Sequence, residues 1–278
     1  MNVGVVMFPT EYSIAPGDLA RALEERNFES VWFPEHTHIP TSRRSPWPGG
    51  GDLPKEYWSA YDPFLALTAA AMTTSRLRLG TGICLVVERD PIVTAKEVAT
   101  LDRLSNGRAM FGIGGGWNAE EMENHGTRFA TRWRVLRERV LAMKEIWAKE
   151  EAEFHGEFVN FDPIRAHPKP VQKPHPPIVM GGDGPRTFDR VIEFADGWMP
   201  ISRPATNPVA KITELRQRAE KAGRDPKSIS ISIFFAKPDR GAIESLTKAG
   251  VDRAIFGLPS AGKDKVLPLL DAYASVMR

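Results

Sequence analysis

The chain has 278 residues, of which 42% are hydrophobic and 26% charged, and its formal net charge is +2. This composition is that of an ordinary globular protein, which argues against disorder, and the near-neutral charge argues against a nucleic-acid-binding protein. The single cysteine, Cys84, excludes an intramolecular disulfide and a cysteine-based zinc site. We expect one domain spanning residues 1–278 and a small-molecule substrate as its partner.

No apolar run approaches the roughly 18 residues of a membrane span. The first residues, MNVGVVMFPTEYS, lack the basic and apolar regions of a secretory signal. We therefore expect a soluble, cytoplasmic protein that does not bind membranes.

Short apolar runs alternate with longer segments of helical period along the chain. The predicted strands are Val3–Phe8, Ser30–Phe33, Leu77–Leu85, Arg108–Gly114, Ile178–Gly181, Gly197–Ile201, Ile229–Phe235 and Arg253–Leu258. The predicted helices are Gly17–Arg26, Pro63–Thr73, Ile92–Leu104, Thr131–Ala148, Pro185–Ala195, Pro208–Ala222, Gly241–Ala249 and Lys263–Met277. Unalternating apolar strands are typical of parallel sheets, and the absence of a polar edge strand favours closure. The chain is therefore predicted to be an α/β protein with a (β/α)8 TIM-barrel fold.

Two connecting segments are longer than a minimal barrel needs. His36–Tyr61 follows the second strand and is rich in proline, glycine and serine. Lys149–Pro177 follows the fourth helix, and its FHGEFVNFD stretch predicts a hairpin. Long loops in compact domains are usually lids or binding loops.

The active site of such a barrel lies at the carboxyl ends of its strands. Glu35, His36 and His38 follow the second strand, and most other strand ends are rich in glycine. Few acid–base residues and much bare backbone favour a site that a flat cofactor approaches closely.

Three motifs point to other chemistry. His36-x-His38 resembles the first ligands of metal-dependent hydrolases, but later strand ends offer no third or fourth ligand. GIGGGW has Trp117 at the third glycine position of a dinucleotide fingerprint. GLPSAGKD has Asp264 where a phosphate-binding loop needs serine or threonine. No metal site is expected.

Four segments carry a family resemblance: PEHTHIP, LGTGICLVVERDPIVTAKEVATLDRLSNGR, FGIGGGWNAEE and PIVMGGDGPRTFDRVIEFADGWMP. Their order and content resemble the luciferase-like monooxygenase superfamily, and within it the probable F420-dependent oxidoreductases. The resemblance implies that a flavin or deazaflavin ring lies over the barrel mouth, against a bulge at Gly82-Ile83 with a non-proline cis peptide. It also places the cofactor phosphate on backbone N–H groups after the fifth strand, which suits a glycine-rich turn before a helix.

The residues expected to bind the cofactor are Gly82, Ile83, Cys84, Gly114, Trp117, Asn118, Met180, Gly181, Gly182, Asp183, Gly184 and Arg186. Other interpretations stay open: Cys84 can be a core side chain and Trp117 a packing aromatic. Some relatives carry a carboxylate proton donor at the position of Trp117.

We expect hydride transfer between coenzyme F420 and an organic substrate, with Glu35 or His36 as catalytic residues that position the substrate or exchange its proton. One alternative is an FMN-dependent monooxygenase that uses reduced flavin and O2. A non-catalytic flavin-binding barrel and a metal-dependent hydrolase are the others. The resemblance also implies a homodimer.

Overall fold

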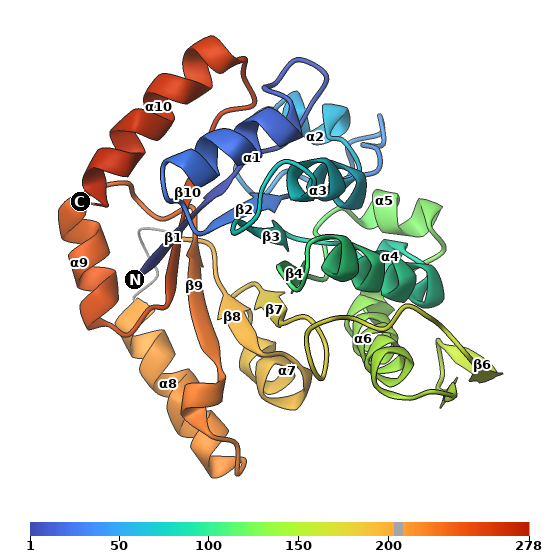
Figure 1. The fold of residues 1–278 in the computed structure, drawn as a ribbon. Helices are drawn as coiled ribbons and strands as arrows, with labels where there is room; N and C mark the ends of the chain where they lie inside the picture. The colour runs from blue at the N-terminus through green and yellow to red at the C-terminus, as the bar shows by residue number, and fades with distance from the viewer. Residues whose placement is uncertain (203–207, 278) are drawn as a thin grey trace.

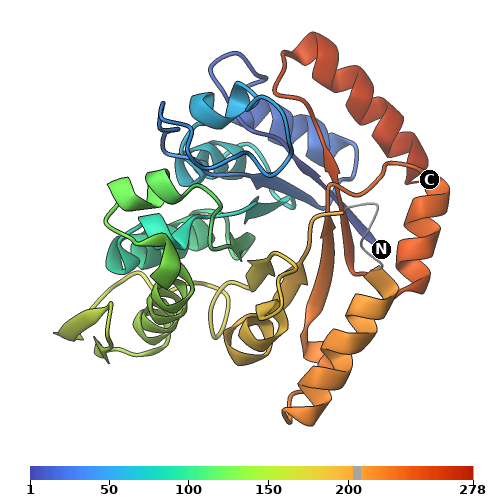
Figure 2. The ribbon, with the colours of Figure 1, turned by 180° about the vertical axis from the view of Figure 1, so that it is seen from behind.

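The computed structural model describes residues 1–202 and 208–277. In this part of the chain, eight parallel strands close into a barrel in the order β1-β10-β9-β8-β7-β4-β3-β2. The barrel strands are β1 (Asn2–Val6), β2 (Ser30–Phe33), β3 (Arg78–Thr81), β4 (Ala109–Ile113), β7 (Ile178–Gly181), β8 (Gly197–Met199), β9 (Ser230–Phe234) and β10 (Arg253–Gly257). The predicted (β/α)8 barrel is confirmed, and helices surround the strands (Figures 1 and 2).

The predicted helices are also confirmed, with ends that shift by one or two residues. They are α1 (Pro16–Glu25), α3 (Pro63–Ala71), α4 (Pro91–Leu104), α6 (Arg132–Ala148), α7 (Thr187–Phe194), α8 (Pro208–Lys221), α9 (Arg240–Lys248) and α10 (Lys263–Val276). Short helical segments were not predicted, because one or two turns carry little apolar periodicity. They are α2 (Glu56–Ser59), α5 (Ala119–Asn124), η1 (Val86–Glu88), η2 (Phe129–Thr131) and η3 (Pro226–Ser228).

Two helices that border the barrel mouth begin at an aspartate followed by proline. The Asp62 carboxylate accepts a hydrogen bond from the Leu65 N–H at 3.0 Å, and α3 begins there. The Asp90 carboxylate accepts hydrogen bonds from Ile92 and Val93 at 2.9 Å, and α4 begins there. Aspartate caps the free N–H groups, and proline suits the first helical position, so the sequence itself sets both helix starts.

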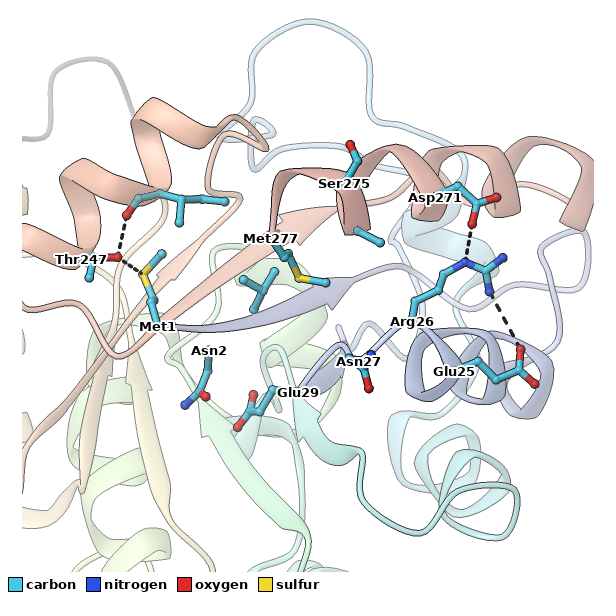
Figure 3. Close-up of a pocket in the computed structure, with 13 residues that line it drawn as sticks. Met1, Asn2, Glu25, Arg26, Asn27, Glu29, Thr247, Asp271, Ser275 and Met277 are labelled. Atoms are coloured by element: carbon cyan, nitrogen blue, oxygen red, sulfur yellow. Dashed lines mark hydrogen bonds and ion pairs between the residues drawn. The ribbon is translucent and has the colours of Figure 1, made fainter.

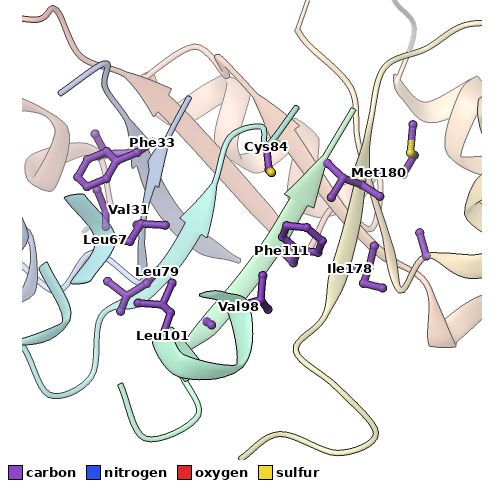
Figure 4. Close-up of a cluster of buried hydrophobic side chains, with 14 of the residues drawn as sticks. Val31, Phe33, Leu67, Leu79, Cys84, Val98, Leu101, Phe111, Ile178 and Met180 are labelled. Atoms are coloured by element: carbon purple, nitrogen blue, oxygen red, sulfur yellow. The ribbon is translucent and has the colours of Figure 1, made fainter. Parts of the chain in front are cut away.

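Side chains alternate between two apolar layers along each strand. The outer layer lies between strands and helices, and Figure 4 shows part of it, including Val31, Leu79, Phe111 and Met180. The inner layer fills the barrel and consists of Val6, Trp32, Met110, Val179, Met199, Phe234 and Ile255. Because both faces are apolar, these strands lack the polar alternation of a half-exposed sheet.

Trp32 fills much of the barrel interior. Its indole N–H donates to the Ser30 hydroxyl at 2.9 Å, and its ring packs against Gly80. A Cβ added at Gly80 would lie 2.3 Å from that ring, so glycine is required there. The indole therefore closes the barrel below the mouth and forms a floor for the pocket above it.

The two long segments lie in different places. Residues after Lys149 form the predicted hairpin, β5 (Ala152–His155) and β6 (Asn160–Ile164), which lies beside α6 at the edge of the molecule (Figure 1). The segment after β2 contributes Tyr57 to a pocket at the barrel mouth. Only the segment after β2 therefore contributes to that pocket.

Candidate active site

A pocket of about 180 Å³ lies at the carboxyl ends of the barrel strands. Its lining is mostly apolar and aromatic, with bare glycine backbone on two sides. The lining residues are Phe8, Pro34, Glu35, His36, Tyr57, Gly82, Ile83, Leu85, Gly116, Trp117, Gly181, Gly182, Met199, Ile201, Phe234 and Phe235. The pocket lies where the barrel rule predicts an active site.

His36 is held by a buried carboxylate. Its Nδ1 lies 2.7 Å from Oε2 of Glu121, whose side chain is fully buried. The other Glu121 oxygen accepts a hydrogen bond from the Thr37 N–H at 3.1 Å. With Nδ1 engaged, the ring presents Nε2 to the pocket, and no described residue forms a hydrogen bond with Nε2. This arrangement fixes the ring orientation and leaves one nitrogen free for chemistry.

Glu121 is brought to His36 by the short helix α5. Asn118 caps that helix, because its side chain accepts a hydrogen bond from the Glu121 N–H at 3.3 Å. Asn-x-x-Glu is the spacing of a capping box, in which the glutamate would bond back to the cap residue. Here the glutamate turns to His36 instead. The sequence analysis did not identify Glu121, although this spacing was a signal for it.

Glu35 also lines the pocket, and its carboxylate is fully engaged. One oxygen accepts a hydrogen bond from the Leu85 N–H at 2.6 Å, and the other pairs with Arg89 at 2.5 Å. Arg89 also pairs with Asp62 and with Glu97. The arginine thus ties the end of β2 to the starts of α3 and α4. The structure places Glu35 in this ion network and His36 at the open face.

Four rings form an aromatic wall on one side of the pocket. The Tyr57 ring lies 4.7 Å from Phe8 and 5.2 Å from His36, measured between ring centroids. Trp117 lies 5.8 Å from His36 and 6.4 Å from Tyr57 in edge-on geometries. Burial raises the pKa of the Tyr57 phenol above its ordinary value. The sequence analysis named Trp117 among the residues expected to bind the cofactor, whereas it did not single out Tyr57 within the long loop after β2.

The expected bulge is present after β3. Met110 pairs with Gly80, Ile113 pairs with Cys84, and β3 has one residue more than β4 between these pairs. The Gly82-Ile83 peptide bond is cis, as the resemblance implied. Both residues line the pocket, and Ile83 also packs on the inner barrel layer.

The turn after β7 presents backbone rather than side chains. Gly181 and Gly182 line the pocket, and Gly182 has a φ of +99° that favours glycine. The Trp198 indole N–H donates to the Gly182 carbonyl at 2.7 Å and fixes the turn. Asp183, Gly184 and Arg186 follow on the exposed rim, outside the pocket lining.

Three arginines gather at the starts of α6 and α7. The Arg190 guanidinium stacks 3.9 Å from the Trp133 ring, and Arg132 lies 3.6 Å from the Phe129 ring. Burial lowers the pKa of Arg190, and the charges of Arg186 and Arg132 lower it further. The buried Nε of Arg132 has no hydrogen-bond partner among the described residues.

Several residues expected to bind the cofactor lie outside the pocket lining. Cys84 and Met180 point into the outer apolar layer (Figure 4), and burial raises the pKa of the Cys84 thiol well above its ordinary value. Asn118 is buried as the cap of α5. Gly114 packs against Ile83, where a Cβ would lie 2.0 Å from the side chain. These four residues support the walls of the pocket and do not line it.

A second buried carboxyl, Glu88, lies behind the pocket. Its Oε1 lies 4.0 Å from the position of a Cβ on Gly116, and its Oε2 has no hydrogen-bond partner among the described residues. Burial, and then the charges of Glu121 and Glu35, raise the pKa of Glu88 to about 9. Glu88 therefore carries its proton at neutral pH.

A larger cavity of about 700 Å³ lies at the opposite, amino-terminal end of the barrel (Figure 3). Its charged side chains neutralise one another. Arg26 pairs with Asp271 at 2.7 Å and with Glu25 at 4.0 Å. The amino-terminal end of such barrels serves stability, so this cavity is not the candidate site.

Within residues 1–202 and 208–277, no helix is both long and apolar enough to cross a membrane. In the same ranges, no group of three or more His, Cys, Asp or Glu side chains could hold a metal ion. His38, the second histidine of the motif after β2, instead meets Asn124 at 2.8 Å.

Known proteins similar to this chain share its whole length. The family model described as luciferase-like monooxygenase matches residues 15–254. An uncharacterised protein of Mycobacterium tuberculosis is 38% identical over 281 residues, covering 99% of this chain and 98% of the relative. The structure of the monooxygenase RslO1 from Streptomyces bottropensis superposes with a TM-score of 0.79 at 22% identity, covering 100% of this chain and 98% of that one. That likeness concerns the fold alone.

Two more distant relatives have names that state a cofactor. The F420-dependent hydroxymycolic acid dehydrogenase of Mycobacterium tuberculosis is 27% identical, covering 82% of this chain and 60% of the relative. The FMNH2-dependent dimethylsulfone monooxygenase of Pseudomonas putida is 29% identical, covering 54% of this chain and 42% of the relative.

Proposed function

We propose, since the chain belongs to the luciferase-like monooxygenase family, that it transfers a hydride between coenzyme F420 and a small organic substrate. The observation that carries this proposal is the His36–Glu121 pair, which faces an apolar pocket with walls of bare glycine backbone. The described residues of the pocket supply a proton-transfer group and an apolar surface, but no nucleophile and no set of metal ligands. Such a site suits chemistry whose electrons come from a bound cofactor.

The residues present fit the charged end of that cofactor. The turn at Gly182 and Gly184 leaves open space, because a Cβ there would meet only the Thr187 hydroxyl at 3.9 and 3.8 Å. Arg186 and Arg190 lie on this side, and Arg132 keeps a buried donor without a partner. Backbone N–H groups before α7, together with these guanidinium groups, would hold the cofactor phosphate.

When bound, F420 supplies or accepts a hydride at its ring, which involves two electrons and no oxygen. His36 holds or moves the substrate proton at Nε2, while Glu121 keeps the imidazole in place. Glu35 positions the segment that carries His36, because its carboxylate is occupied by Leu85 and Arg89. The aromatic wall excludes water from the reacting atoms.

The FMN-dependent monooxygenase is the second candidate function. It is supported by the description of the family and by the FMNH2-dependent relative. We prefer F420 because the pocket offers one free proton-transfer group, which suffices for hydride transfer. Trp117, where some relatives carry a carboxylate, leaves His36 as the proton donor in this proposal.

Equilibrium titration of the purified protein tests the proposal. F420 and FMN are added separately, and binding is followed by cofactor fluorescence. Micromolar or tighter binding of F420, with FMN at least tenfold weaker, supports the deazaflavin reaction. Preference for FMN supports the monooxygenase, and binding of neither overturns both. A non-catalytic barrel would bind cofactor without turning over any substrate.

We further propose that the protein forms a homodimer through α3 and α4. These adjacent helices expose large apolar side chains: Leu65 on α3 is 75% exposed and Met72, just after α3, is 68% exposed, while Val93 is 55% and Leu104 50% exposed on α4. Large exposed apolar side chains on neighbouring helices are typical of interaction sites. Sedimentation velocity of the wild type and of Leu65→Glu tests this: a dimer that the substitution dissociates supports it, and a wild-type monomer overturns it.

A further inference from the structure

We propose that the pocket takes a small, uncharged substrate with a flat conjugated carbonyl, and that Tyr57, packed edge-on against Trp47 behind it, is the part of the aromatic wall that selects this substrate. This inference rests on the proposed function and deepens it by naming the substrate class. Neither residue was assigned a role by the sequence analysis. Three observations carry it: the charges around the pocket, the geometry of its rings and the contacts that hold the wall in place.

The pocket lacks a free charge to bind an anion. Among the described residues no lysine or arginine lines it, and its carboxylate, Glu35, is already bound by Leu85 and Arg89. Arg43 lies 5.9 Å from the centroid of the Trp117 ring and is not part of the pocket lining. When His36 is protonated, the Glu121 carboxylate 2.7 Å away balances its charge, so a carboxylate or phosphate in the pocket would lose its hydration without gaining an unpaired counterion. The lining therefore selects against anionic substrates.

The rings of the wall suit a flat, unsaturated substrate. Tyr57 is tilted against Phe8 and His36 and stands edge-on to Trp47 at 5.8 Å and to Trp117 at 6.4 Å. Aromatic faces and edges at such distances attract planar π systems more than saturated ones. His36 Nε2 is the polar atom left free to donate to a carbonyl oxygen among the described residues. The Tyr57 hydroxyl already bonds to Trp47, so Tyr57 offers chiefly its ring.

The wall is held in place without a ligand. The Ser45 N–H donates to the Glu120 carboxylate at 2.9 Å, the Ser45 hydroxyl also bonds to it, and the Ala119 N–H donates to that hydroxyl at 3.1 Å. Burial would raise the pKa of Glu120, but these Ser45 donors lower it to about 2. The carboxylate thus stays charged, and the loop after β2 stays pinned to α5.

Trp47 itself is seated by glycine. A Cβ on Gly49 would lie 2.4 Å from the indole, so only glycine lets the ring fold down toward Tyr57. The loop then turns through Gly50 and Gly51, with φ of +77° and +72°. A preorganised wall pays little ordering cost on binding, which favours selectivity.

The space available restricts the size of the substrate. The pocket measures about 180 Å³, below the roughly 300–1,000 Å³ of typical small-molecule sites. Under the proposed function, the cofactor ring shares this mouth. The substrate is therefore expected to be small, and a single six-membered ring is the size chosen for the probes.

The step balances for a conjugated ketone. A C–H bond forms at the β-carbon with the hydrogen and electron pair given up by a reduced 5-deazaflavin. The C=C π bond breaks, and its electrons move onto the carbonyl oxygen. The imidazolium of His36 donates its Nε2 proton to that oxygen, and the α-carbon takes the proton on ketonisation. Solvent then reprotonates His36, so the substrate gains two electrons and two hydrogens.

The test compares three probes of one size on protein loaded with cofactor. Cyclohex-2-enone is conjugated and uncharged, cyclohexanone is saturated, and cyclohex-1-ene carboxylate is anionic. Dissociation constants are measured by calorimetry, and enone reduction is followed with reduced F420. Variants Trp47→Leu, Tyr57→Leu and Tyr57→Phe probe the wall. Trp58→Leu, at a tryptophan that is 52% exposed on α2, is the matched control.

We expect the enone to bind at least tenfold tighter than the carboxylate and severalfold tighter than the ketone. Trp47→Leu and Tyr57→Leu should each weaken enone binding about tenfold, whereas Trp58→Leu should change it less than twofold. Tyr57→Phe should keep the preference for the conjugated ring.

Two outcomes overturn the inference. One is that the carboxylate binds as tightly as the enone or more tightly. The other is that Trp47→Leu and Trp58→Leu weaken enone binding equally. Both outcomes are compatible with a protein that binds F420 and transfers its hydride to another class of substrate, so they leave the proposed function intact. Failure to bind either F420 or FMN instead overturns the proposed function, whatever the probes do.

Discussion

The two ends of the barrel differ in how their carboxylates are held. At the amino-terminal end, burial would raise the pKa of Glu24, but N–H groups of Ser75, Arg76 and Leu77 lower it to about 2. At the mouth, burial and neighbouring carboxylates raise the pKa of Glu88 to about 9. The amino-terminal cavity is the larger, about 700 Å³ against 180 Å³. A protonated carboxyl at the mouth and a charged, hydrogen-bonded carboxylate at the other end, rather than the volume of a cavity, therefore distinguish the two ends.

Replacing His36 should produce the largest effect. His36→Ala removes the one free proton-transfer group of the mouth, so turnover of the enone probe should fall by about 10² to 10⁴. The dissociation constant of the cofactor should change less than threefold, because the proposed phosphate site lies after β7, away from His36. Steady-state kinetics and fluorescence titration measure both. His38→Ala, two residues away and outside the pocket lining, is the control, and equal losses of turnover and cofactor binding would mean that His36 only shapes the pocket.

Replacing an arginine should cost more stability at the mouth, at Arg89, than at the amino-terminal end, at Arg26. Arg89→Met leaves the buried Glu35 carboxylate without its partner, and the free energy of unfolding should fall by about 3–5 kcal/mol. Arg26→Met at the amino-terminal end removes a pair whose Asp271 side chain is 66% exposed, so the loss should stay within about 1 kcal/mol. Urea denaturation compares them, and similar losses would contradict the distinction.

The arginine cluster at the mouth should control cofactor affinity. Arg132→Met removes a buried guanidinium with an unpaired donor, so the cofactor should bind about tenfold more weakly and with less dependence on salt. Arg134→Met lies on the same helix, where Arg134 pairs with Glu157 at 2.6 Å, and should leave affinity unchanged. Fluorescence titration at two salt concentrations tests this. Affinity that does not differ between the variants would exclude Arg132 from the phosphate site.

Replacing Glu88 should change how the stability of the fold depends on pH. Because its pKa is raised to about 9 by burial, the folded protein holds a proton that the unfolded chain releases above its ordinary pKa of 4.5. The stabilising contribution is present below pH 4.5 and is lost as the pH rises towards 9. Glu88→Gln removes this pH-dependent contribution to the free energy of unfolding, which changes by about 1 kcal/mol per pH unit.

Urea unfolding at pH 6 and pH 8 measures that difference. The wild type should lose more stability than Glu88→Gln between the two values. Glu25→Gln, at an exposed glutamate of the amino-terminal cavity, should follow the wild type. Parallel behaviour of wild type and Glu88→Gln would show that Glu88 is already charged.

The barrel and part of its site could be read from local sequence patterns. Apolar runs and proline after aspartate marked strands and helix starts, because those signals act within a few residues. The order of strands and loops along the chain also placed His36 directly after the second strand. The bulge at Gly82 came from a family resemblance, since no local pattern distinguishes it from an ordinary strand end.

Other features depended on segments far apart in the chain. Glu121 lies 85 residues from His36, and its partnership depends on α5 packing under the loop after β2. Cys84 and Met180 sit at strand ends but turn to the helices, because side chains alternate between the two faces of a barrel wall.

By itself, then, the sequence determined the strands and the helices, because periodicity and capping are local properties, and it pointed to the end of the barrel where the candidate site lies. Only the tertiary structure decided which groups at that end are paired, buried or free. Hydrogen bonds and burial depend on neighbours that the chain brings together across 50 to 90 residues.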